Sequence, residues 1–279
     1  MATQPVLAGS GSTTGPDAAD WIDVAGLHKY YRPRKSEPTH ALSDIDFQVR
    51  RGEFVSVVGP SGCGKTTLLK ILAGLIPKSE GEVSIAGHAV TKPLPEVGMV
   101  FQAATLLPWR TILENVMVPV EIQKLDKGRH RDKAMELIEM VGLQGFEDKY
   151  PYELSGGMQQ RAGICRALVH DPRNVILDEP TSALDVTTQD EILRLLGDLR
   201  STTEVTFVLI AHDLAVVQAF ADDVVVLDRG RVVDRFDARD FRAPEREPVT
   251  RRLVDAVLPP RPSSAQSATD EWKCRGSRY

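Results

Sequence analysis

The chain has 279 residues, with 34 Lys and Arg against 39 Asp and Glu, so its net charge is -5. This size accommodates one large domain or two small ones, and the acidity argues against a protein that binds nucleic acid by bulk charge. A membrane-spanning helix needs about 20 consecutive apolar residues, and the best runs, at 54–58, 207–211 and 224–227, are far shorter. With no signal peptide and three widely spaced cysteines, the chain is expected to stay in the reducing cytosol.

Composition divides the chain into three parts. Residues 1–20 are rich in Gly, Ser, Thr, Ala and Pro, which predicts a disordered leader. Residues 21–240 are expected to form the main domain, and residues 241–279 a C-terminal extension and tail. Residues 229–252 hold eight Arg and five acids; interspersed charges are typical of a solvated face, with a lipid-facing role as the alternative.

Short apolar runs alternate with helical patterns inside the main domain. The run 53–58 precedes a glycine-rich turn and then Leu68, Leu69, Leu72 and Leu75 at helical spacing, with Gly74 marking the end of the helix. Continuous apolar runs are typical of parallel strands buried on both faces. We expect an α/β fold with a mostly parallel sheet, in which further strands lie at 175–177, 205–211 and 224–227 and a helix carries the apolar residues from 192 to 199.

The segment from about 103 to 158 has a different pattern. Thr111 and Glu114 form a capping box, and Ala134, Leu137, Ile138 and Val141 form an apolar stripe that stops at Gly142. These features predict a mostly helical insertion between two halves of the sheet domain.

A phosphate-binding loop follows the first apolar strand of that sheet. Its residues are Gly59, Pro60, Ser61, Gly62, Cys63, Gly64, Lys65 and Thr66, and we include Thr67 in the same site. Glycines in such a loop let backbone N–H groups surround the β- and γ-phosphates at a helix N-terminus. Lys65 is expected to reach the phosphates and the Thr66 hydroxyl to ligate Mg²⁺. At Cys63 a tolerated small residue is favoured over a redox switch.

Two acids end the apolar strand at 175–177. Asp178 is expected to hold Mg²⁺ through water, and Glu179 to polarise the attacking water. Taken alone, such acids could be merely solvated, because strand ends lie at the surface. Their occurrence with a phosphate-binding loop favours the catalytic interpretation.

A second anion site is predicted at 154–161. Ser155, Gly156 and Gly157 stand at the head of a predicted helix, where N–H groups attract negative charge. Because the nucleotide already has its phosphate cradle, this segment suggests docking onto a nucleotide held by another subunit.

These motifs, in this order over about residues 22–240, resemble the nucleotide-binding subunit of an ABC (ATP-binding cassette) transporter. The resemblance implies a P-loop NTPase cassette that binds ATP and Mg²⁺ and hydrolyses ATP. It also implies a mostly parallel sheet core, an antiparallel β subdomain and the helical insertion.

The resemblance assigns roles to further residues, although each has an ordinary structural interpretation when taken alone. Tyr31, or less favourably Tyr30, stands where an aromatic stacks on adenine. Gln102 matches the Q-loop glutamine that contacts Mg²⁺ and the attacking water. Ser155 and Gly157, with Gly156 between them, match the groups that touch the γ-phosphate across a dimer; Asp185 matches the D-loop aspartate at that interface; and His212 matches the histidine that senses the γ-phosphate.

The transporter subtype is mixed along the chain. Residues 106–116 and 166–172 resemble importers of nitrate, sulfonate and taurine, whereas 180–186, 211–217 and 248–253 resemble oligopeptide, dipeptide and nickel importers. In this family the helical insertion receives the coupling helix of the membrane subunit, so the first likeness is given more weight. Trp109 is interpreted either as a partner contact or as a buried filler of the insertion.

We therefore expect the ATPase subunit of a small-solute importer, on the cytoplasmic face of the cell membrane. The implied partners are transmembrane permease subunits, a second copy of the chain or a paralogue, and an extracytoplasmic solute-binding protein; no nucleic acid is expected. An exporter-type cassette and an ABC ATPase that does not transport remain alternatives.

Overall fold

A six-stranded sheet forms the centre of the computed structural model, which describes residues 21–31, 39–182, 184–202, 204–211 and 213–257. Its strand order is β10-β9-β3-β8-β7-β6. All neighbouring pairs are parallel except β9 and β10. The strands are β3 (Phe54–Val58), β6 (Val97–Val100), β7 (Asn174–Asp178), β8 (Thr206–Ile210), β9 (Asp223–Asp228) and β10 (Arg231–Asp237).

Both faces of this sheet are covered, which explains its continuous apolar strands. Along β8, Phe207 and Leu209 belong to one hydrophobic core, and Val208 and Ile210 belong to the other. Side chains alternate in this way because successive Cβ atoms of a strand point to opposite faces. The two cores leave the strand ends as the accessible part of the sheet.

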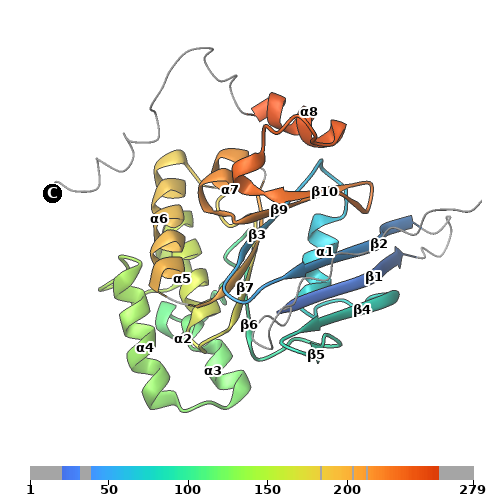
Figure 1. Cartoon of the computed structure of the whole chain (residues 1–279). Helices are drawn as coiled ribbons and strands as arrows, with labels where there is room; N and C mark the ends of the chain where they lie inside the picture. Colours follow the sequence, from blue (N-terminus) through green and yellow to red (C-terminus); the bar gives the residue numbers. More distant parts are fainter. Residues whose placement is uncertain (1–20, 32–38, 183, 203, 212, 258–279) are drawn as a thin grey trace, which may run out of the picture.

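Helices cover one face of the sheet, and a second sheet lies on the opposite side (Figure 1). The second sheet is antiparallel with order β2-β1-β4-β5 and shares its core with α1. The antiparallel subdomain implied by the resemblance is therefore confirmed. The elements are β1 (Ile22–Tyr31), β2 (Thr39–Val49), β4 (Glu80–Ile85), β5 (His88–Ala89) and α1 (Lys65–Leu72) on that side, with α6 (Val186–Thr202) and α7 (Leu214–Phe220) on the helical side.

The helical insertion begins at the predicted capping box. The Thr111 hydroxyl accepts a hydrogen bond from the Glu114 N–H, and the Glu114 carboxylate accepts one from the Thr111 N–H. The stripe through Ala134, Leu137 and Ile138 is buried as expected, but the helices continue past residue 158. They are α2 (Ile112–Val116), α3 (Val118–Gln123), α4 (Lys127–Met140), η1 (Pro151–Glu153) and α5 (Gly156–Leu168).

Buried Asn115 shapes the loop before α2. Its Oδ1 accepts from the Leu107 N–H at 2.6 Å, and its Nδ2 faces the carbonyls of Leu107, Arg110 and Thr111 at 2.9–3.1 Å. This loop holds Trp109 with 71% of the side chain exposed. The interpretation of Trp109 as a buried filler is therefore wrong.

Helix α1 ends near Gly74, as the sequence predicts. The last residue of α1 is Leu72, and Leu75, which fits the helical spacing, lies beyond the helix and is exposed. Gly74 has φ +69°, and a Cβ there would lie 2.3 Å from the Lys92 carbonyl group. The chain therefore turns away at this glycine, as is common at a helix C-terminus.

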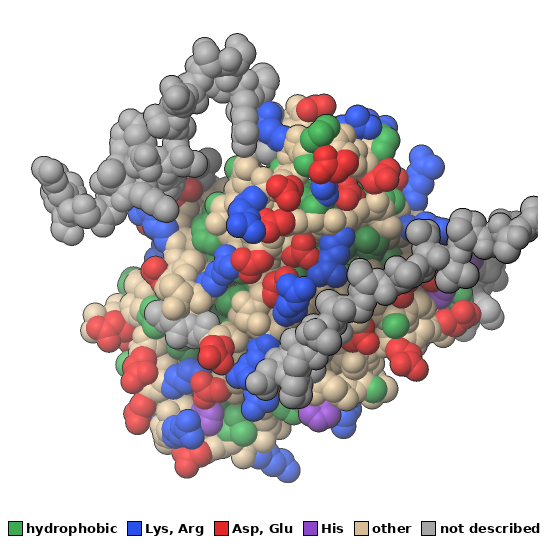
Figure 2. Space-filling model, in the orientation of Figure 1, with side chains coloured by type: hydrophobic (Ala, Val, Ile, Leu, Met, Phe, Trp, Pro, Cys, Tyr) green, Lys and Arg blue, Asp and Glu red, His purple; other side chains and the backbone are tan. Residues whose placement is uncertain are grey.

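The C-terminal extension packs against β10 through Asp234. This carboxylate accepts hydrogen bonds from the Thr250 hydroxyl at 2.8 Å and the Glu247 N–H at 3.1 Å, and it pairs with Arg246. These contacts fix η2 (Ala238–Asp240) and α8 (Pro248–Val257) to the sheet. Acidic and basic side chains intermix on this face (Figure 2), as the interspersed sequence predicts.

Some sequence predictions lie outside the described residues. They are the leader at 1–20, the tail beyond 257 and the assignment of His212. Within the described ranges, the helices are too short or too polar to cross a bilayer.

Candidate functional site

The phosphate-binding loop connects the buried strand β3 to helix α1. Gly59 has φ +151° and Gly64 has φ +111°; a Cβ at Gly59 would lie 2.1 Å from the Leu227 carbonyl oxygen, and one at Gly64 would lie 2.6 Å from that of Ala41. No other residue type fits this turn without displacing backbone. Lys65 is buried and donates hydrogen bonds to the Gly59 and Pro60 carbonyls at 2.8 and 3.0 Å. These two hydrogen bonds hold the first residues of the loop against the Lys65 ammonium group.

An open cavity of about 380 Å³ lies over this loop. Ser61, Gly62, Gly64, Lys65, Thr66 and Thr67 line it, together with Glu179 and three residues at the start of β2: Thr39, His40 and Ala41. The β2 residues have no sequence signal of their own, because the pairing of β2 with β1 is what brings them to the cavity. Tyr31 lies opposite Thr39 in that pairing, half exposed at the end of β1 and with its ring 5.1 Å from the Lys29 ammonium nitrogen.

Glu179 and Gln102 meet at the edge of this cavity. Gln102 follows β6, Glu179 follows β7, and the Gln102 amide nitrogen lies 3.4 Å from a Glu179 carboxylate oxygen and 3.2 Å from the Ser182 hydroxyl. Glu179 has φ +47°, a conformation that is uncommon outside glycine, and its N–H donates to the Ile210 carbonyl at 3.2 Å. Strain of this kind is typical of functional positions.

Asp178, at the end of β7, has a raised pKa because burial disfavours its charged form and Glu179 adds a neighbouring negative charge. A carboxyl with this environment gains from a nearby cation. A cation bound beside Asp178 would offset both effects.

Cys63 is a buried residue of the loop, and burial raises the pKa of its thiol. Thiol reactivity requires exposure and a lowered pKa. The structural interpretation of Cys63 is therefore favoured over the redox switch.

Segment 154–161, which we call the signature because the family resemblance rests on it, and Asp185 lie elsewhere. Ser155 caps α5 by accepting from the Met158 N–H at 3.3 Å. Asp185 precedes α6 and accepts from both the N–H and the hydroxyl of Thr188, at 3.0 and 2.8 Å, which lowers the pKa of the Asp185 carboxyl. None of Ser155, Gly156, Gly157 and Asp185 lines the phosphate-loop cavity, and neither do Tyr31, Gln102 and Asp178. Among the predicted catalytic residues, Glu179 lines the cavity, and Gln102 reaches it through its contact with Glu179.

Thr188 connects these two segments and was missed by the sequence analysis. A Cβ at Gly157 would lie only 2.3 Å from the Thr188 Cγ2 methyl, whereas a Cβ at Gly156 would meet nothing within 4 Å. Steric contact therefore requires a glycine at position 157 but not at position 156. Gly157 permits close packing of α5 against α6, which a spacing pattern alone does not reveal.

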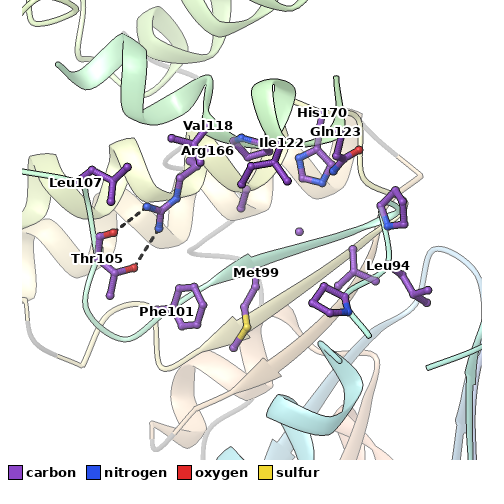
Figure 3. Close-up of a pocket in the computed structure, with 16 residues that line it drawn as sticks. Leu94, Met99, Phe101, Thr105, Leu107, Val118, Ile122, Gln123, Arg166 and His170 are labelled. Carbon is purple, nitrogen blue, oxygen red and sulfur yellow. Dashed lines mark hydrogen bonds between the residues drawn. The ribbon is translucent and has the colours of Figure 1, made fainter. Parts of the chain in front are cut away.

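A second cavity of about 400 Å³ lies between the edge strand β6 and the helices α3 and α5. Figure 3 shows Met99 and Phe101 on its sheet side, with Val118, Ile122 and Arg166 facing them from the helices. The lining is mainly apolar, and the Ile122 side chain is 75% exposed. We call this cavity the β6 groove.

Comparison with known proteins decides the family. The ABC transporter family profile matches residues 42–182. The chain belongs to the ABC transporter family. Its ATP-hydrolysing cassette fold is shared with the ATP-binding cassette MJ0796, solved as a dimer in a post-hydrolysis state bound to ADP and Pi. The TM-score is 0.71 at 33% identity, over 78% of this chain and 99% of that one.

Curated relatives of this ABC chain include two import proteins. A methionine import ATP-binding protein, MetN of Geobacillus kaustophilus, is 40% identical over 86% of this chain and 72% of its own length. An aliphatic sulfonates import ATP-binding protein, SsuB of Bacillus cereus, is also 40% identical, over 74% of this chain and 80% of its own. The predicted family and fold are confirmed, and methionine import is a relative's function that the sequence patterns did not suggest.

The contact between Gly157 and Thr188 predicts a stability difference within the signature. Gly157→Ala should lower the free energy of unfolding by about 1–3 kcal/mol through overpacking, whereas Gly156→Ala should change it by less than about 1 kcal/mol. Urea unfolding would measure both. Thr188→Ser removes the opposing methyl and should restore most of the loss in the Gly157→Ala background; equal effects of the two glycine variants would contradict the packing account.

Proposed function

We propose that the chain is the ATP-binding and ATP-hydrolysing subunit of an ABC importer, which powers uptake of a small solute through a separate permease. The observation that carries this proposal is the contact of Gln102 with Glu179, a residue that lines the phosphate-loop cavity, which Ser155 and Gly157 do not line. Such a chain has the groups for hydrolysis on one surface and a second anion site for another subunit's nucleotide.

The loop residues would bind the nucleotide. Backbone N–H groups from Gly59 to Thr67 and the α1 N-terminus would hold the β- and γ-phosphates, and Lys65 would exchange its two carbonyl partners for phosphate oxygens. Tyr31 would stack on adenine. Thr39, His40 and Ala41 would border the ribose side of the same cavity, because they line it from β2.

The chain's oxygen donors fit Mg²⁺. The Thr66 hydroxyl, the Gln102 amide oxygen and the carboxylate of Asp178, directly or through water, are the hard ligands that Mg²⁺ prefers. When bound, Mg²⁺ would neutralise charge on the β- and γ-phosphate oxygens. Glu179 would orient the attacking water and accept its proton, and Gln102 would hold the Glu179 carboxylate and that water in place.

A second subunit would complete each site. Its Ser155, Gly156 and Gly157 would contact the γ-phosphate from the opposite side, with Asp185 at the interface and His212 sensing the γ-phosphate. ATP would thereby join two subunits and hydrolysis would release them. The dimeric MJ0796 cassette supports this arrangement; the partner is a second copy of this chain or a paralogue.

The β6 groove is the proposed site for the permease. Its apolar lining, which includes the exposed Ile122 and Leu107 from the loop that carries Trp109, suits the apolar face of a short helix from a membrane subunit. This docking would hold the chain at the cytoplasmic face of the cell membrane. An extracytoplasmic solute-binding protein would belong to the same complex.

The proposed solute is of the sulfonate, taurine or nitrate type, supported by the SsuB relative and by residues 106–116 of the helical insertion. The MetN relative makes methionine a second candidate. ATP hydrolysis by the purified complex, measured with taurine and with methionine, would distinguish the two candidates, since only the true solute should stimulate it.

Replacement of the proposed catalytic carboxylate tests the ATPase assignment. Glu179→Gln should reduce the ATP turnover rate by about a hundredfold or more and should let ATP-bound dimers accumulate in gel filtration. Asp198→Asn, on the exposed side of α6, serves as the matched acid control. An unchanged turnover rate in Glu179→Gln would remove Glu179 from its role.

The raised pKa of Asp178 predicts a pH dependence of Mg²⁺ binding. Protons compete for this carboxylate at a higher pH than for an ordinary Asp, so Mg²⁺ affinity should fall as pH decreases toward the raised pKa and stay constant above it. Titration of Mg²⁺ into the nucleotide-bound protein between about pH 8 and pH 5 would measure this. The phosphates of the nucleotide also titrate in this range, and Asp178→Asn controls for them, because it lacks only the Asp178 carboxyl. The variant should therefore show a smaller fall in Mg²⁺ affinity than the wild type. Identical pH profiles of Mg²⁺ affinity in the two proteins would contradict the assignment.

The β6 groove assignment predicts a loss of permease binding. Ile122→Asp places a charge in the apolar lining and should abolish co-purification with a multi-span permease from detergent extracts. Met140→Asp changes an exposed apolar residue of α4 outside the groove and should leave co-purification intact. Retention of the permease by Ile122→Asp, or recovery of ribosomes or DNA in its place, would contradict the proposal.

A further inference from the structure

Helix α5 holds the backbone on both sides of Gln102. The buried Gln160 side chain donates from Nε2 to the Phe101 carbonyl at 2.9 Å. Arg166 donates from Nη2 to the Ala104 carbonyl at 2.8 Å and from Nη1 to the Thr105 carbonyl at 2.9 Å. Gln102 is therefore carried by a short segment, 101–105, whose ends are tied to one helix.

The Arg166 contact suits a guanidinium group. Two N–H groups of its planar fork reach two consecutive carbonyls, and Nη2 also lies 3.2 Å from the Thr105 hydroxyl. Thr105 has φ +45°, which is unfavourable for a β-branched residue. The three hydrogen bonds from Arg166 stabilise this turn, and a lysine ammonium would not span both carbonyls in the same plane.

The contact also lies between two functional surfaces. Phe101, Thr105 and Arg166 line the β6 groove (Figure 3), whereas the Gln102 side chain reaches Glu179 and Ser182. The same helix begins at Ser155 of the signature. Movement of α5 relative to β6 would therefore shift Gln102 against Glu179.

We propose that Arg166, together with Gln160, is a positioning residue that fixes segment 101–105 so that Gln102 meets Glu179. This inference rests on the proposed ATPase function and deepens it, because it makes the placement of Gln102 depend on the helix that carries the signature. Arg166 and Gln160 act through Gln102 and need not touch the nucleotide.

A double-mutant cycle with Gln102 tests the proposal on the full chain, with ATP and Mg²⁺ and without a permease. Arg166→Met should lower kcat by about tenfold to a hundredfold, since small misplacements of catalytic groups have effects of this size, while KM for ATP changes less than about twofold. In the Gln102→Ala background, Arg166→Met should lower kcat by less than about twofold, because residues of one network are not additive. Gln160→Met should behave in the same way.

Two further variants separate positioning from general stability. Lys133 donates to the carbonyl of Leu168, the last residue of α5, and pairs with Asp171. Lys133→Gln removes this cation, and its kcat should stay within about twofold of the wild type. Arg166→Lys keeps the charge but has one donor centre, so its kcat should lie between those of Arg166→Met and the wild type. If Arg166→Met fails to fold, a kcat of Arg166→Lys below that of the wild type carries the test.

The outcomes are distinct. Multiplicative losses of kcat from Arg166→Met and Gln102→Ala would overturn the positioning role while leaving the ATPase assignment intact. Wild-type kcat in Arg166→Lys together with a loss in Lys133→Gln would also overturn it. A wild-type chain without Mg²⁺-dependent ATP hydrolysis would overturn the proposed function itself.

Discussion

The parallel pairing of β6, β7, β8 and β3 is the constraint on which the candidate site depends. Parallel strands expose their carboxyl ends at one edge of the sheet, and ligands of such sheets bind at that edge. Here the phosphate-binding loop follows β3, Gln102 follows β6, Asp178 ends β7 and Glu179 follows it. Because both faces of the sheet are buried in separate cores, these candidate residues meet at the strand ends.

The same constraint agrees with the proposed composite site. The sheet edge gathers the phosphate-binding loop, Gln102 and Glu179, while Gly156 and Gly157 stand at the head of α5, where Gly157 packs against Thr188 of α6. Helix α5 in turn holds segment 101–105. A helix that begins at the proposed intersubunit anion site and reaches the β6 groove is suited to transmit movement between a permease and the nucleotide.

The sequence was most informative where chemistry is contiguous along the chain. The phosphate-binding loop needs glycines at fixed spacing after a buried strand, so its residues and its position before α1 followed directly. The capping box at Thr111 and Glu114 was predictable for the same reason. These local patterns carry their own physical cause, and the structure places them as expected.

Features that depend on tertiary pairing could not be found in this way. Thr39, His40 and Ala41 border the cavity only because β2 pairs with β1, and Thr188 and Arg166 act through contacts between distant segments. The sequence allowed Trp109 to be either buried or exposed, and the structure shows it exposed on the loop that Asn115 holds.

Complementation between two inactive variants tests the composite site most directly. Lys65→Ala disables the phosphate-binding loop, and Ser155→Arg blocks the signature, so each variant alone should lack ATPase activity. A mixed dimer joins the intact loop of one chain to the intact signature of the other, and mixing should restore hydrolysis. Mixed dimers that form but remain inactive in single-turnover assays would contradict the account.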